Sequence, residues 1–85
     1  PYHPAFGQLV EDAIWYDKIV DDIKHINAKV IRVEIEANSK DLNNIIGHKK
    51  ENINKLKDTY AVITIVKCNN KIKPGKFKIN VLETA

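Results

Sequence analysis

The sequence contains a single cysteine, Cys68, so no disulfide can form within the chain. Its three histidines, His3, His25 and His48, lie far apart, and no cysteine is close enough to them to give the paired spacing of a zinc site. No carboxylate pair stands at an expected strand end, and no base accompanies the thiol. We therefore expect no structural metal, no cofactor and no enzyme activity.

Long apolar runs are also missing. No stretch approaches the roughly 18 apolar residues that a membrane-spanning helix needs, and the first residues lack the charged and apolar regions of a signal peptide. We expect an intracellular protein, cytoplasmic or nuclear, with an organelle matrix also open, and no membrane partner. The chain has no methionine at its start and stops just after a strand-like segment, so we expect a piece of a longer protein.

The charge of the chain is unevenly distributed. Of the 85 residues 44% are hydrophobic and 29% charged, with only three glycines and three prolines, which is typical of one folded domain. Residues 1–39 carry seven acidic and four basic side chains, whereas residues 40–85 carry ten lysines and four acidic side chains. The basic half is suited to attracting phosphate, although the same lysines can form an ordinary solvated surface.

Hydrophobic periodicity indicates the order of the elements. Apolar residues recur at spacings of three and four over residues 8–26, which predicts a helix, and at a spacing of two over residues 28–37, which predicts a strand. Two short helices follow, joined by a tight turn at residues 47–50, and then β-branched strands at 61–66 and 77–82. The expected fold class is α+β, with a three-stranded antiparallel-type sheet and the helices packed on one face.

The segment around the tight turn carries a motif of two aliphatic residues, a glycine-containing turn, and further aliphatic residues in register. Its members are Ile45, Ile46, Gly47, His48, Lys49, Lys50, Ile53 and Leu56. Over residues 30–82 the chain resembles a KH domain, whose turn reads Gly-x-x-Gly, with one strand before the turn and two after it, the eukaryotic-type order. The resemblance implies a KH-like domain over residues 28–85, a helical extension over residues 1–27, and the absence of the closing C-terminal helix. In vigilin-like proteins, which carry many KH domains in tandem, such a closing helix runs into the next domain, and our hypothesis is that residues 8–26 are such a segment.

What the resemblance implies about function is the binding of single-stranded RNA, or single-stranded DNA, by a domain of a longer RNA-associated protein. In the family, the glycines let the phosphate backbone approach the N–H groups of the turn. Here Lys50 stands at the second glycine position, which adds a charge that attracts phosphate and a side chain that obstructs it. The expected backbone contacts are Gly47, His48, Lys49, Lys50 and Lys55. Ile45 and Ile63 are candidates for the floor of the groove and could equally be core residues.

The alternative is a degenerate KH domain that no longer binds RNA and acts as a scaffold for neighbouring KH domains or other protein partners. Tyr60 stands where family members carry another glycine, and an exposed Tyr60 together with an exposed Trp15 would suit a protein interface. The acidic first helix would also repel phosphate. Trp15 has a second interpretation as a core residue.

Overall fold

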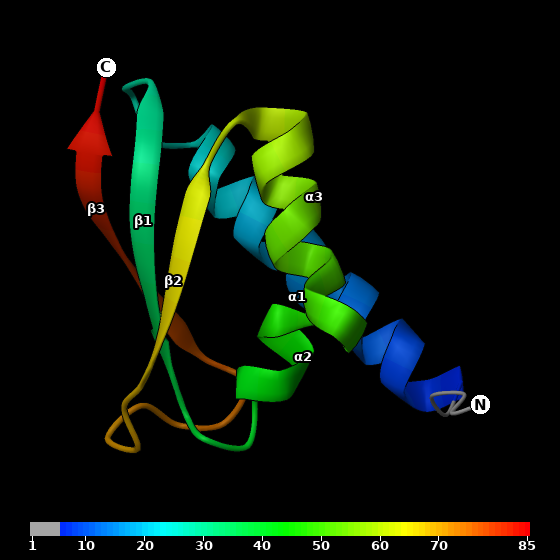
Figure 1. Cartoon of the computed structure of the whole chain (residues 1–85). Coiled ribbons are helices and arrows are strands. Elements are labelled where there is room, and N and C mark those ends of the chain that lie inside the picture. Colours follow the sequence, from blue (N-terminus) through cyan, green and yellow to red (C-terminus); the bar gives the residue numbers. More distant parts are fainter. Residues whose placement is uncertain (1–5) are drawn as a thin grey trace.

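The computed structural model describes residues 6–85 and contains the elements in the order that the sequence predicts (Figure 1). They are α1 (Phe6–Lys24), β1 (Val30–Ala37), α2 (Leu42–Ile46), the 3₁₀ turn η1 (His48–Lys50), α3 (Glu51–Tyr60), β2 (Ile63–Cys68) and β3 (Phe77–Thr84). The α+β class is confirmed. None of the helices over residues 6–85 has the length and apolarity to cross a bilayer.

The sheet is mixed, so the prediction of an antiparallel-type sheet is wrong. The strand order is β2-β1-β3, with β1 in the centre, parallel to β2 and antiparallel to β3. The reason is the crossover from β1 through α2 and α3, which returns the chain to the end of the sheet where β1 began. Strands β2 and β3, although consecutive, form no hairpin and lie at opposite edges.

The loop over residues 69–76 carries the chain from one edge of the sheet to the other across the end of β1. The N–H of Asn69 donates to the carbonyl of Ala37 at 2.8 Å, and the Asn38 side-chain amide donates to the carbonyl of Ile72 at 3.1 Å. The N–H of Gly75 donates to the Asp41 carboxylate at 2.8 Å. These contacts hold the loop at the same end of the molecule as α2 (Figure 1).

The three α-helices lie on one face of the sheet, as predicted, and the core is between the two layers (Figure 1). Alternate residues of β1, namely Val33, Ile35 and Ala37, are fully buried beneath the helices. Trp15 of α1 belongs to the same core and meets the Phe77 ring edge-on, with the ring centroids 5.7 Å apart. The interpretation of Trp15 as an exposed interface residue is therefore wrong.

Within the described part of the chain, residues 6–85, the other face of the sheet carries no helix (Figure 1). It presents Arg32, Glu34 and Glu36 of β1, flanked on β2 by Ile63 and Ile65. A sheet with one solvated face is compatible with a single helical layer. Residues 6–85 thus leave three accessible surfaces of the sheet beside the helical layer: this open face and the two sheet edges.

Candidate nucleic-acid interface

The tight turn after α2 requires a glycine at its first position. Gly47 has φ of +82°, and a Cβ placed on it would lie 2.9 Å from the backbone nitrogen of Asn52. That distance is shorter than any ordinary contact and involves backbone that cannot move aside. Gly47 is therefore a structural residue that lets α3 begin directly against the end of α2.

The two lysines that follow adopt the left-handed conformation. Lys49 has φ of 54° and Lys50 has φ of 61°, a region that costs a residue with a Cβ roughly 1–2 kcal/mol. Lys50, at the second position where the family motif has glycine, thus keeps a backbone conformation that glycine adopts freely. Both side chains are exposed.

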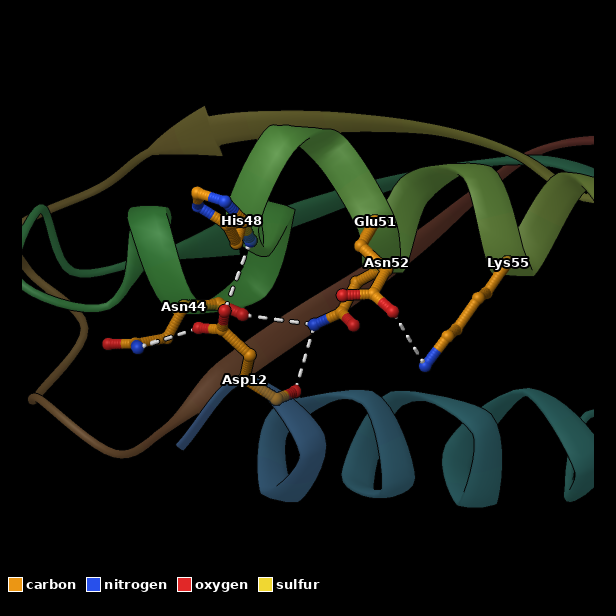
Figure 2. A network of polar contacts seen from close by, with 6 residues as sticks. All are labelled: Asp12, Asn44, His48, Glu51, Asn52 and Lys55. Carbon is orange, nitrogen blue, oxygen red and sulfur yellow. Dashed lines mark hydrogen bonds and ion pairs between the residues drawn. The ribbon is translucent and has the colours of Figure 1, made fainter. Parts of the chain in front are cut away.

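A buried carboxylate on α1 holds the turn in place (Figure 2). Asp12 is only 4% exposed, and its carboxylate accepts a hydrogen bond from the Asn44 side-chain amide at 2.9 Å and from the His48 N–H at 3.0 Å. The Asn52 side-chain amide donates to the Asp12 carbonyl at 2.9 Å and to the Asn44 carbonyl at 3.0 Å. The network satisfies a buried charge and links α1 to both helices around the turn.

Sequence reasoning missed Asp12, which it treated only as one of the negative charges of an acidic first helix. The residues that Asp12 contacts are 32 to 40 positions further along the chain. Asparagine and aspartate are also common surface residues, so no local pattern marks these as partners. This contact matters for function because the His48 N–H of the turn already donates to the Asp12 carboxylate and is not available to a phosphate.

Between the turn and the β2 edge lies a groove of about 230 Å³, which we call the β2 groove. It is lined by Ile46, Lys50, Ile53, Thr64 and Val66. Thr64 is 9% exposed, and its hydroxyl oxygen is buried without a hydrogen-bond partner within residues 6–85. A buried hydroxyl without a partner costs about 1–3 kcal/mol, which distinguishes this position from an ordinary core residue.

The predicted backbone contacts divide between two cavities. Lys50 lines the β2 groove, whereas His48 and Lys49 line a separate cavity of about 400 Å³ on the outer side of α3. Lys55 lines that second cavity as well. Its ammonium lies 3.4 Å from the Glu51 carboxylate and 5.4 Å from the centre of the Tyr16 ring of α1. Lys55 therefore faces α1 and does not border the β2 groove.

Neither predicted floor residue lies in the β2 groove. Ile45 is 0% exposed and belongs to the core. Ile63 is 44% exposed on the helix-free face of the sheet, because the pairing of Thr64 beside Val33 turns Thr64 toward the helices and Ile63 away from them. The β-branched run over residues 61–66 is apolar at almost every position, so it gives no alternation from which the buried face can be chosen.

The charge around the β2 groove is basic. Lys50 stands at its rim, and Lys57, four residues after Ile53, lies on the same side of α3.

Comparison of the chain with protein-family models, with curated proteins and with solved structures finds no match. The geometry and chemistry of this site are therefore what indicate a function.

Proposed function

We propose that the chain is a divergent KH domain of a longer RNA-associated protein and that it binds single-stranded nucleic acid, RNA in particular, in the β2 groove. The observation that carries the proposal is the composition of the groove, which combines an aliphatic floor, a buried hydroxyl without a partner and a lysine at the rim. Each of these matches one part of an unpaired nucleotide.

An unstacked base has a flat apolar face and a polar edge. Ile46 and Ile53 supply apolar surface against which the face can pack, and the Thr64 hydroxyl supplies a donor and acceptor for the edge. This hydroxyl oxygen is buried and has no partner within residues 6–85, so a base in the groove would pair it after a rotamer change that turns it outward. Lys50 supplies the positive charge for the adjoining phosphate.

The binding energy for phosphate is divided between backbone N–H donors of the turn and the charge of the lysines. Because the Asp12 carboxylate already accepts the His48 N–H, the turn offers phosphate fewer backbone donors than a Gly-x-x-Gly turn would. Lysine charge must then supply most of the phosphate contacts, and binding should depend strongly on salt. With about two phosphates neutralised, affinity for a single strand falls about sevenfold between 50 and 200 mM salt.

Fluorescence anisotropy of a randomised single-stranded RNA oligonucleotide tests the proposal. We expect saturable binding that weakens with salt and is lost when Lys49→Asp is combined with Lys50→Asp. The matched control combines Lys24→Asp with Lys29→Asp, which makes the same change in net charge between the end of α1 and the start of β1, outside both the turn and the β2 groove. Equal affinity losses in the two double variants would contradict a site at the turn and indicate only general charge attraction.

A second candidate function, the protein-interaction scaffold, is favoured by one specific observation. The Asp12 carboxylate and the Lys50 side chain both stand at the turn, where a phosphate would approach the backbone. If the folded domain binds no RNA at the lower salt concentration, the KH-like fold serves as a scaffold and its partners are proteins.

A further inference from the structure

The edge of the sheet opposite the β2 groove is also accessible. Strand β3 pairs with β1 along one side, and its other side pairs with no strand within residues 6–85 (Figure 1). Its outer N–H and C=O groups can therefore pair with an additional strand. The register of β3 against β1 shifts between Val81 and Glu83, so the regular part of this edge is Phe77 to Val81.

A second groove lies between this edge and the end of α1, and we call it the β3 groove. It has a volume of about 300 Å³ and is lined by Asp22, His25, Ile26, Ile79 and Val81. Ile79 and Val81 pair with Ile35 and Val33, which places them on the helical side of the sheet. In a strand added to β3, every second side chain would point to the same side and enter the groove.

The chemistry of the β3 groove differs from that of the β2 groove. Its floor is aliphatic, and its titratable lining residues are Asp22 and His25, with Asp21 adjacent in the helix. The whole of α1 carries five acidic and two basic side chains. A lysine or arginine side chain in this groove would pack its methylene groups on the isoleucines and direct its charge toward Asp22.

We propose that the β3 groove binds an extended basic peptide segment that adds a strand to the edge at Phe77–Val81 and places a lysine or arginine side chain between β3 and the end of α1. Main-chain pairing with an edge strand supplies affinity in this mode of recognition, and the side-chain groove supplies specificity. The site is independent of the proposed RNA-binding function, because the two grooves lie at opposite edges of the sheet.

Fluorescein-labelled hexapeptides in which valine alternates with lysine, arginine, glutamate or threonine test this proposal. We expect the lysine and arginine peptides to bind and to shift the amide resonances of residues 77–81 and 22–26 in the ¹⁵N-labelled protein. The Asp22→Lys variant should bind them about tenfold more weakly. Asp17→Lys, an exposed change of equal charge outside the groove, should have a smaller effect.

A lysine peptide with N-methyl groups along one edge separates strand addition from simple charge attraction. We expect methylation to abolish binding, because it removes the donors that pair with β3. The proposal is overturned if the methylated peptide binds equally well, if the glutamate peptide binds as tightly as the lysine peptide, or if neither basic peptide shifts the resonances of β3.

Discussion

The two edges of the sheet have similar architecture and opposite charge. At each edge a groove lies between the helical layer and a strand of which one side pairs with no other strand of residues 6–85, and the floor of each groove is formed by aliphatic side chains. Lys50 lines the groove at the β2 edge, whereas Asp22 lines the groove at the β3 edge together with His25. The comparison shows that similar backbone frameworks can be suited to different partners by the charge of the adjoining helix or turn.

The grooves also differ in how their walls are held. The turn beside the β2 groove is fixed by the buried network around Asp12, whereas the β3 groove is bordered by the exposed end of α1 and the turn after it. Helix α1 therefore contributes to both edges, by its buried Asp12 to one and by its exposed Asp22 to the other. Substitutions at each edge can therefore test the two grooves separately.

The largest effect is expected from Asp12→Ala, which removes the carboxylate that holds the turn of the β2 groove. Two partly buried donors, on Asn44 and His48, lose a buried carboxylate acceptor, so we expect the free energy of unfolding to fall by about 3 kcal/mol. Urea denaturation measures the change. Asp17→Ala, an exposed change on the same helix, should alter stability by less than about 0.5 kcal/mol. Equal effects of the two substitutions would show that the network is not what holds the turn.

Thr64→Val tests the hydroxyl that distinguishes the floor of the β2 groove. Removal of a buried hydroxyl without a partner should stabilise the free domain by about 1–2 kcal/mol, while RNA affinity falls. Denaturation and anisotropy on the same variant give the two readouts. A loss of stability with unchanged RNA affinity would mean that the hydroxyl has a structural partner and no ligand.

Lys50→Gly separates the two opposing effects of the lysine at the rim. Glycine adopts the left-handed conformation of this position without a Cβ penalty, so we expect the domain to gain about 1 kcal/mol in stability. If charge dominates binding, RNA affinity and its salt dependence both fall. A rise in affinity would instead show that the side chain obstructs the approach of phosphate.

The smallest effect concerns Glu36, which lies on the open face of β1 between the two edges. Hydrogen bonds from the side-chain amides of Asn80 in β3 and Asn69 after β2 hold the pKa of Glu36 below its ordinary value. The stability that they contribute is present above the pKa of the unfolded chain and is lost as pH falls through the folded-state pKa. In a carboxyl NMR titration, Asn80→Ala should raise the pKa of Glu36, whereas Asn70→Ala should leave it unchanged.

The order of the elements was predictable from the sequence because each element shows its own period, such as the alternation in β1 that buries Val33 and Ile35. The direction of β2 relative to β1 was not predictable. The same order of helices and strands allows β2 to pair with β1 after a crossover or with β3 in a hairpin. The floor of the β2 groove was missed for a related reason. Ile63 and Thr64 exchange faces with a one-residue change of register, and only the pairing with β1 decides between them.

The positions of the charged residues were predictable only in part. The sequence indicated a basic C-terminal half and an acidic first helix, and the two grooves do carry Lys50 and Asp22 respectively. The sequence did not indicate that Lys55 faces α1, or that Asp12 lies beneath the turn. Both depend on how α1 packs against α3, which involves residues about forty positions apart.

The most direct test of the account is an NMR titration of the ¹⁵N-labelled domain with a randomised single-stranded RNA oligonucleotide. The account predicts that the amide resonances that shift most are those of Ile46, Lys50, Ile53, Thr64 and Val66, and that the resonances of β3 remain in place. Shifts centred on β3 or on the open face of the sheet, or no shifts at all, would contradict nucleic-acid binding in the β2 groove.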